Sequence, residues 1–276
     1  MSRSIPTMNT LKRIGAAALV AGLMAVANAV PSVADEDDLW PGLRKELYGA
    51  KPILEADGAV TLDAPYRADD AAVVPITLRI PASIGARAKS LSLIIEKNPM
   101  PLAATFTFGP AAGNGEHVIS TRVRIDMYSN VRAVLETDDG ALHMDTKFVK
   151  AAGGCSAPAL KDAAEALAGL GKMKLRTLET NQTPLTQEAQ VMIRHPNYSG
   201  MQMNQVTGLY IPAKYVESME VRRGDEIVFT MTGGISLSEN PNIRFTYAAA
   251  GDNTLSVVAK DTDGKTFTTR QAGSGS

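Results

Sequence analysis

The chain has 276 residues, of which 45% are hydrophobic and 21% charged, and its 28 basic side chains nearly balance its 29 acidic ones. These proportions are those of an ordinary globular protein, and they exclude a collagen, a coiled coil, a disordered tail and a multi-span membrane protein. A formal net charge of −1 gives no electrostatic footprint for nucleic acid. Because Cys155 is the single cysteine, the chain can form no intrachain disulfide, multi-cysteine metal site or Cys-x-x-Cys redox pair.

The first residues have the features of a secretory signal peptide. Three basic residues precede an apolar stretch over 14–27, which is too short for a transmembrane helix, and small residues follow it. Cleavage can follow Ala29 or Ala34, and the acidic run that begins at 35 favours Ala34. The order of these regions favours a signal peptide over 1–34 rather than a buried helix, and it predicts an exported protein.

The segment 35–157 is predicted to form a first β-rich domain. A short helix is expected from 35 to about 48, and turn residues then separate strand-like runs about every ten residues, as in a sandwich. Strands are expected near Val60 and over 73–80, 90–96, 105–108, 117–125, 130–137 and 141–149.

Two of these predicted strands alternate clearly, so one face of each is expected to be solvated. In the fifth, the alternation separates Ile119, Thr121, Val123 and Ile125 from Ser120, Arg122 and Arg124. In the seventh, it separates Leu142, Met144, Thr146 and Phe148 from His143, Asp145 and Lys147.

A short helical linker is predicted over 158–171, where apolar residues fall at helical spacing and Gly171 is placed to end the helix. A second β-rich domain follows over 172–276. Its strands are expected over 175–179, 189–194, 217–221, 226–231, 243–248, 254–261 and 265–270. The predicted fold class is therefore all-β, with two immunoglobulin-like sandwich domains joined by a short helical linker.

The one segment that could carry chemistry is 152–158, directly after the last strand of the first domain. Nucleophile-elbow, zinc-protease, phosphate-loop and haem-attachment motifs are absent, so no catalytic residue is predicted. Gly153 and Gly154 remove side-chain bulk before Cys155, which predicts a flexible arm that presents the thiol to other proteins. Cys155 is the predicted site of covalent attachment.

The thiol is expected to be exposed and modestly activated. A helix that starts near Pro158 would favour the thiolate, although no cation lies within four residues of Cys155. Exposure predicts disulfide-linked dimers in oxidised preparations and an intact fold after Cys155→Ser. The alternative is a small cysteine buried at a strand end.

The Gly-Gly-Cys segment that ends a β-rich half resembles the swinging arm of SoxY, the sulfur-carrying subunit of the periplasmic SoxYZ complex. The second half resembles SoxZ through 189–196, Gly200, 211–213 and the strands from 217 to 231. The chain is most similar to the single-chain SoxYZ-like carriers associated with quinoprotein dehydrogenases. It departs from SoxY because Ser-Ala-Pro and a second domain follow Cys155, so the arm is tethered at both ends.

The resemblance implies a periplasmic carrier that is not an enzyme and has no cofactor and no metal. Its partners would be periplasmic oxidoreductases, namely a c-type cytochrome, a quinoprotein dehydrogenase and Sox-type enzymes. It also implies that the two halves pack face to face, so that separate fragments 35–157 and 172–276 should associate.

Two other functions remain open from the sequence. One is a non-covalent partner or chaperone of a quinoprotein dehydrogenase, in which Cys155 is incidental. The other is a copper-binding module that uses Met201, Met203 and His195, although methionines in such a loop more often pack between sheets. His195, next to Pro196, is expected to end a strand at the domain interface.

Overall fold

A computed structural model describes residues 38–158, 167–179, 183–250 and 254–271. Leu39–Ser276 form one compact unit. The predicted signal peptide over 1–34 lies outside the described residues, as does most of the predicted linker helix, 159–166. Within the part of the chain that is described, no helix is long and apolar enough to cross a membrane.

The described residues are mainly strands, as the alternation and turn signals predict. The first half contains α1 (Trp40–Tyr48), β1 (Ile53–Glu55), β2 (Thr61–Asp63), β3 (Val74–Ile80), α2 (Ala82–Gly85), β4 (Ala88–Ile95), β5 (Leu102–Phe108), η1 (Pro110–Ala112), β6 (His117–Val123), β7 (Ser129–Thr137) and β8 (Leu142–Val149). The second half contains β9 (Met173–Leu178), β10 (Thr186–Ile193), β11 (Val216–Arg223), β12 (Glu226–Gly233), β13 (Asn242–Ala248), β14 (Leu255–Asp261) and β15 (Thr266–Gln271). Each predicted strand is present within a few residues of its expected bounds, and β1 is an addition.

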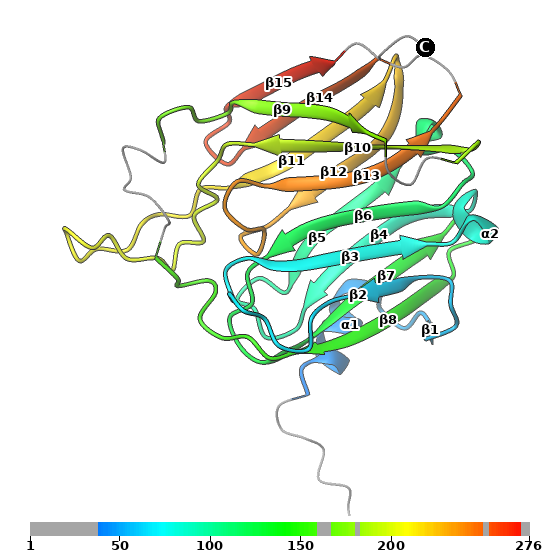
Figure 1. The fold of residues 1–276 in the computed structure, drawn as a ribbon. Coiled ribbons are helices and arrows are strands. Elements are labelled where there is room, and N and C mark those ends of the chain that lie inside the picture. Colours follow the sequence, from blue (N-terminus) through cyan, green and yellow to red (C-terminus); the bar gives the residue numbers. More distant parts are fainter. Residues whose placement is uncertain (1–37, 159–166, 180–182, 251–253, 272–276) are drawn as a thin grey trace, which may run out of the picture. The chain divides into compact units, whose positions relative to one another are not determined.

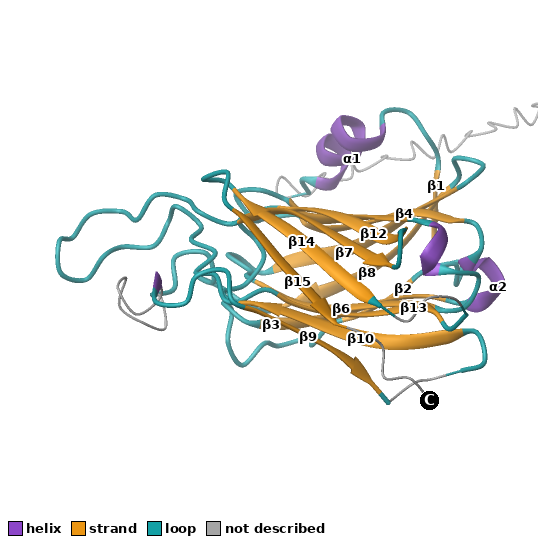
Figure 2. Ribbon diagram, turned by 90° about the horizontal axis from the view of Figure 1, so that it is seen from above, coloured by secondary structure: helices purple, strands orange, loops and turns teal. Residues whose placement is uncertain are grey.

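The strands form two sheets, which are stacked as two layers (Figures 1 and 2). The nine-stranded sheet has the order β1-β8-β7-β4-β5-β12-β11-β14-β15, and the six-stranded sheet has the order β2-β3-β6-β13-β10-β9. Among the described strands, neighbours pair in an antiparallel manner, except β1 with β8, which are parallel. This arrangement confirms the all-β, sandwich-type fold.

The two halves join edge to edge, and the expectation of face-to-face packing is wrong. In the nine-stranded sheet β5 pairs with β12, from Phe108 opposite Phe229 to Ala104 opposite Gly233. In the six-stranded sheet β6 pairs with β13, where Ile119 lies opposite Phe245. Because both sheets run from one half into the other, each half covers the open strand edges of its neighbour.

One hydrophobic core lies between the sheets and includes side chains from both halves. The ring of Phe229 lies edge-on to Phe106 of the first half, with centroids 5.7 Å apart, and to Phe245, with centroids 5.2 Å apart. All three rings are buried. Aromatic pairs in this geometry stabilise a core beyond the area that they bury, so the junction is part of the core.

The outer face of the nine-stranded sheet is covered near its β8 edge by α1. Trp40 packs with Ile94, Val134, Leu142 and Met144 in a second, smaller cluster. The alternation of β8 therefore has a different origin from the predicted one, because its apolar face lies under α1. Towards the other sheet, the Asp145 carboxylate accepts a hydrogen bond of 2.8 Å from the Leu62 amide.

Candidate functional site

The Cys155 segment, residues 153–157, follows β8 and is held by backbone hydrogen bonds to residues 125–126, which follow β6. The Gly153 amide donates to the Asp126 carbonyl at 2.8 Å, and the Gly154 amide donates to the Ile125 carbonyl at 2.9 Å. The segment is therefore an ordered turn in this state. The prediction of a flexible arm is wrong for this state. The arm role of Gly153 and Gly154 remains a prediction about another state of the segment.

The two glycines are needed for different reasons. Gly153 is exposed and has a φ of 78°, in the left-handed region where glycine has no steric penalty. A Cβ on Gly154 would lie 2.1 Å from the Ala71 carbonyl oxygen and 2.7 Å from that of Ile125. Gly154 thus allows its backbone to pack closely against the backbone of Ala71 and Ile125, next to the buried Cys155.

The side chain of Cys155 is fully buried, with 0% of its surface exposed, although it is not part of the main core. Burial raises the pKa of its thiol to about 12, the nearby Asp126 carboxylate adds to the rise, and the Arg124 guanidinium opposes it. The expectation of an exposed, modestly activated thiol is wrong for this state. Local sequence suggested a helix dipole, whereas groups distant in sequence enclose the sulfur.

A loop of the second half closes over the Cys155 segment. The Ser199 hydroxyl donates a hydrogen bond to the Cys155 carbonyl, and the Gln202 side-chain amide donates to the Ala157 carbonyl at 3.0 Å. Gln202 also accepts from the Ser199 amide at 3.2 Å, which links the two contacts. We call Ser199 and Gln202 the clasp. Both side chains are buried, at 4% and 0% exposure.

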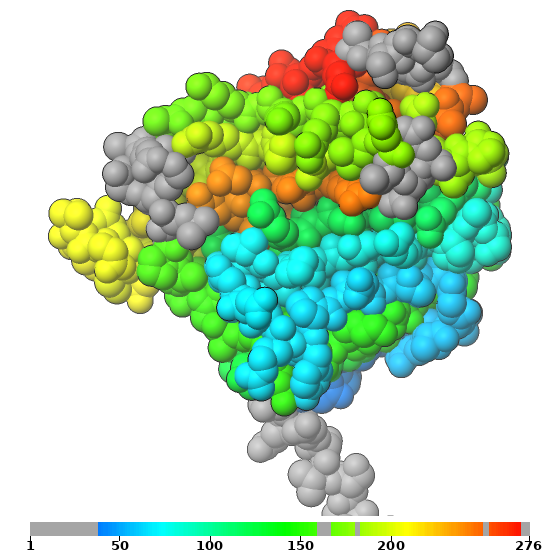
Figure 3. Space-filling model, in the orientation of Figure 1, coloured from blue at the N-terminus to red at the C-terminus, as the bar shows by residue number. Residues whose placement is uncertain are grey.

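The loop that carries the clasp, 194–215 between β10 and β11, continues into an exposed projection. Its residues 201–213 form part of the yellow region that protrudes in Figures 1 and 3. Val206 is 93% exposed, and Leu209 and Tyr210 are each more than 60% exposed. The loop is thus buried at the clasp and open to solvent at its tip.

Arg124 lies at the end of β6 beside the same segment. The predicted strand face would place it in solvent, but the structure buries it to 2% exposure. Its Nη1 donates to the Gly154 carbonyl at 3.5 Å, and its Nη2 donates to the Asn197 carbonyl at 3.3 Å. Among the described residues its buried Nε has no hydrogen-bond partner. Sequence reasoning missed this residue, because its cover comes from the second half.

His195 directly follows β10, and its contacts are with residues of the second half, so its predicted place at the domain interface stays a prediction. Its Nδ1 lies 2.9 Å from the Asn197 side-chain oxygen, and its Nε2 lies 3.4 Å from an Asp261 carboxylate oxygen. Histidine and aspartate are both fully buried, and burial lowers the pKa of the imidazole. Because both ring nitrogens are engaged, His195 has no free position for copper, and the structure gives the Met201–Met203 alternative no support.

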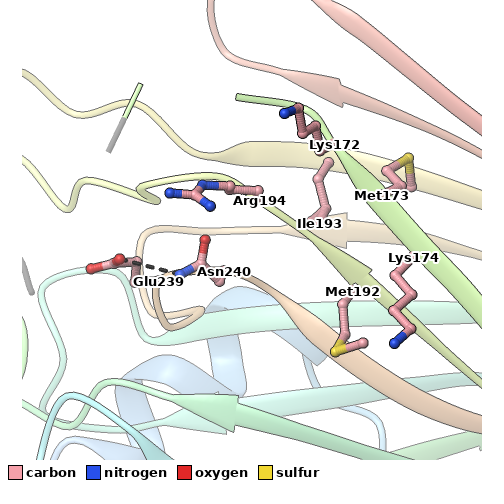
Figure 4. A pocket seen from close by; sticks show the side chains of 8 residues that line it. All are labelled: Lys172, Met173, Lys174, Met192, Ile193, Arg194, Glu239 and Asn240. Carbon is pink, nitrogen blue, oxygen red and sulfur yellow. Dashed lines mark hydrogen bonds between the residues drawn. The ribbon is translucent and has the colours of Figure 1, made fainter. Parts of the chain in front are cut away.

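No group of three or more His, Cys, Asp or Glu side chains that could hold a metal occurs among the residues that the structure describes. A pocket of about 310 Å³ lies near the start of β9 and the end of β10, and Cys155 is not in its lining. Lys172, Lys174 and Arg194 line it together with Glu239 (Figure 4).

The fold and the contacts of the Cys155 segment define the class of protein. It is an all-β chain whose candidate reactive group is a buried thiol, on a segment that residues of both halves hold in place.

Comparison with protein families identifies the two halves. A family model described as "Sulfur oxidation protein SoxY" matches residues 44–155, and one described as "Sulphur oxidation protein SoxZ" matches residues 176–272. The chain therefore contains a SoxY-family domain and a SoxZ-family domain in one polypeptide. SoxY and SoxZ are carrier and partner proteins rather than catalytic enzymes, so the chain has a carrier role in sulfur oxidation.

Two solved structures illustrate the likeness. The sulfur carrier protein SoxY from Chlorobium limicola f thiosulfatophilum is 26% identical, with a TM-score of 0.34, and the alignment covers 41% of this chain and 91% of that one. A β-glycosidase from Bacteroides vulgatus is 8% identical over 83% of this chain and 26% of that one, with a TM-score of 0.24. A search of curated proteins finds no significant match.

Proposed function

We propose that this protein is an exported, periplasmic carrier that holds a sulfur-containing group covalently on the Sγ of Cys155 while partner oxidoreductases act on it. The observation that supports this most strongly is the position of Cys155. The SoxY match ends at this residue, and it is the only thiol in the chain. Two side chains of the SoxZ half donate hydrogen bonds to the backbone of the Cys155 segment. The order of basic, apolar and small residues over 1–34 supports export.

The closed site described above is a resting state of this carrier. A thiol with a pKa of about 12 is protonated at neutral pH, and only the thiolate is a good nucleophile. Loading therefore requires the Cys155 segment to leave its site, which returns the pKa towards the ordinary value of 9.0. The sequence-derived arm and the enclosed thiol are then two states of one segment.

Opening of the segment is energetically accessible. The hydrogen bonds that hold it include the backbone bonds of Gly153 and Gly154 and the two bonds from the clasp. Each contributes about 1 kcal/mol net, so opening costs on the order of a few kcal/mol. Such a difference leaves about 0.1–10% of molecules open, enough for a partner to capture.

The chemistry of loading follows from the thiol. In the open state the Cys155 sulfur loses its proton to water and couples to a sulfur atom of the incoming group. This coupling removes two electrons, which pass to a c-type cytochrome or a quinoprotein dehydrogenase. A Sox-type partner then hydrolyses the oxidised end of the group, which leaves the coupled sulfur on Cys155 as a persulfide. A partner oxidoreductase withdraws six electrons from that sulfur as three oxygens from water are added, and a second hydrolysis releases it and regenerates the thiol. In this scheme the carrier supplies the attachment point and its partners supply the redox and hydrolytic chemistry.

One observation favours a second candidate, a non-covalent partner or chaperone of a quinoprotein dehydrogenase. Cys155 has no exposed surface, as expected of an incidental cysteine. This candidate predicts that the exported protein co-purifies with a dehydrogenase and carries an unmodified thiol. Covalent carriage predicts that the dehydrogenase association, if present, survives replacement of Cys155 while sulfur oxidation does not.

The test is the oxidation of a reduced inorganic sulfur compound by the host after Cys155→Ala. We expect oxidation to be lost while the exported protein accumulates at its normal level, because the attachment atom is gone. Ser156→Ala is the matched control, since Ser156 is the exposed neighbour of Cys155, and it should leave oxidation unchanged. A Cys155→Ala strain that oxidises the compound at the wild-type rate would contradict covalent carriage.

A further inference from the structure

Arg124 is a buried cation without a matching anion. It is 2% exposed, and none of the ion pairs formed among the described residues includes it. Its two hydrogen bonds, to backbone carbonyls, are 3.5 and 3.3 Å long, beyond the usual range for N–H···O bonds. Its Nε is buried and has no hydrogen-bond partner in the described part of the chain.

This arrangement is unfavourable unless a negative group joins it. A buried charge costs several kcal/mol unless it is paired and its donors are satisfied. The contrast with Arg132 is informative, because Arg132 is similarly buried but pairs with the Glu96 carboxylate and lies over the Trp40 ring. Asp70 and Glu239 are close enough to favour the charged form of Arg124, yet neither contacts it as an ion pair.

The unsatisfied donors lie beside the carrier sulfur. Nη1 of Arg124 contacts the carbonyl of Gly154, the residue before Cys155, and the Cys155 sulfur and the guanidinium interact electrostatically. Asn197, which accepts from Nη2, belongs to the same loop as the clasp. The Arg124 guanidinium therefore lies beside the Cys155 segment and contacts the backbone of both halves.

We propose that Arg124 is a positioning residue that provides the counter-ion for a negatively charged group on Cys155, so that the closed site retains anionic adducts in preference to neutral or cationic ones. This inference rests on the proposed carrier function and adds the charge of the cargo to it. A protonated thiol leaves Arg124 uncompensated, whereas a sulfur-bound oxyanion brings a permanent negative charge and acceptor oxygens for Nε. The Asp126 carboxylate disfavours negative charge on the same sulfur. Removal of this carboxylate should therefore strengthen the preference of the closed site for anionic adducts.

The experiment loads the full chain with two adducts of similar size and opposite charge. With tetrathionate, the Cys155 thiolate attacks a bridging sulfur, the central S–S bond breaks, and thiosulfate leaves with the electron pair, so that Cys155 carries –S–SO₃⁻. With aminoethyl methanethiosulfonate, the thiolate attacks the sulfenyl sulfur and methanesulfinate leaves, so that Cys155 carries a cationic aminoethylthio group. In both reactions the proton of the thiol goes to water. The melting temperature of each adduct is then measured at neutral pH.

We expect the anionic adduct to melt at a temperature at least about 2–4 °C above that of the cationic adduct, the shift that a modest ion pair gives in a chain of this size. The difference should vanish in Arg124→Met, persist in Arg124→Lys and widen in Asp126→Asn. Arg122→Met is the matched control. Arg122 lies near the end of β6, two residues before Arg124, and its buried Nε also has no hydrogen-bond partner among the described residues, but its side chain contacts the Asn240 carbonyl instead of the Cys155 segment. A comparison of two adducts within one variant cancels the general destabilisation that a substitution causes.

The outcomes separate this inference from the proposed function. Equal melting of the two wild-type adducts, or a difference that survives in Arg124→Met, would overturn the role of Arg124 and leave covalent carriage intact. Failure of both reagents to modify the folded chain would overturn both, because Cys155 would then never leave its enclosure. If Arg124→Met does not fold, Arg124→Gln replaces it. Because salt screens a buried pair only weakly, most of the wild-type difference should persist in 1 M salt, and its complete loss would contradict a buried counter-ion.

Discussion

Cys155 owes its chemistry to residues that lie far from it in sequence. Asp126 and Arg124 come from the segment that follows β6, and Ser199 and Gln202 come from the second half. Burial and the Asp126 carboxylate keep the thiol neutral at rest, and the Arg124 guanidinium opposes them. In the oxidising compartment that we propose for this carrier, a neutral thiol is an advantage, since a lone exposed thiolate would form disulfide-linked dimers.

The raised thiol pKa predicts how stability depends on pH. The folded thiol titrates near 12 and the unfolded thiol near 9, so the folded state holds the proton more tightly between these values. The stabilisation from the neutral thiol is complete below pH 9 and is lost as the pH rises towards 12. Wild type should therefore lose stability relative to Cys155→Ala over this window, by up to about 1.4 kcal/mol per pH unit.

Denaturant unfolding of both proteins at pH 8 and pH 10.5 measures this difference. The comparison of wild type with Cys155→Ala cancels the effect of all other groups that titrate between these pH values, because the two proteins differ only in the thiol. A wild-type protein that keeps the same stability margin over the variant at both pH values would mean that the thiol is not shielded in the folded state.

At the scale of elements, the loop between β10 and β11 controls access to the Cys155 segment. Gln202 is buried and donates to the Ala157 carbonyl, so Gln202→Ala removes one of the bonds that keep the site closed. A lost hydrogen bond of about 0.5–1.5 kcal/mol raises the open population about two- to tenfold. Alkylation of Cys155 in the folded protein should accelerate by the same factor.

The control for this substitution lies in the same loop. Gln205 is exposed, and its side-chain amide contacts only the Met203 carbonyl, at 3.4 Å, so Gln205→Ala should leave the alkylation rate unchanged. Equal rates for Gln202→Ala and wild type would show that the clasp does not limit access to the thiol. Acceleration by both variants would point to general loosening of the loop.

At the scale of the whole molecule, the fusion produces one folded unit from two families. Both sheets and the main core run across the junction, so strand pairing between the halves does not depend on the residues that link them in sequence. The association of separate fragments 35–157 and 172–276 stays a prediction. The structure supplies its physical basis, because each fragment would expose two unpaired strand edges.

The local sequence pattern predicts where the strands lie, but it does not predict which residues contact one another across the fold. Alternation and turn residues predicted each strand except β1, which has only three residues, Ile53–Glu55. The same alternation placed Arg124 in solvent, because period-2 reasoning cannot see a loop from another half that covers a strand end. Gly154 was read as a source of flexibility, whereas its role here is steric and depends on the Ala71 carbonyl.

The sequence predicts Cys155, the single cysteine after two glycines, as the candidate site, but it does not predict the state of that residue. The structure buries the Cys155 side chain, and its segment accepts hydrogen bonds from Ser199 and Gln202, more than 40 positions along the chain. No local signal in the sequence specifies such contacts, since Ser and Gln are common in solvated loops. The SoxZ-like half was recognised as a partner domain, and its part in enclosing the thiol required the structure.

The central claim, covalent carriage on Cys155, is tested most directly by the intact mass of the native protein exported by its host during growth on a reduced sulfur compound. We predict a mass above that of the unmodified mature chain, localised to the peptide that contains Cys155 and removed by a thiol reductant. The same preparation of Cys155→Ala should show no such adduct. A native chain with an unmodified thiol, isolated without reductant while the host oxidises sulfur, would contradict the account.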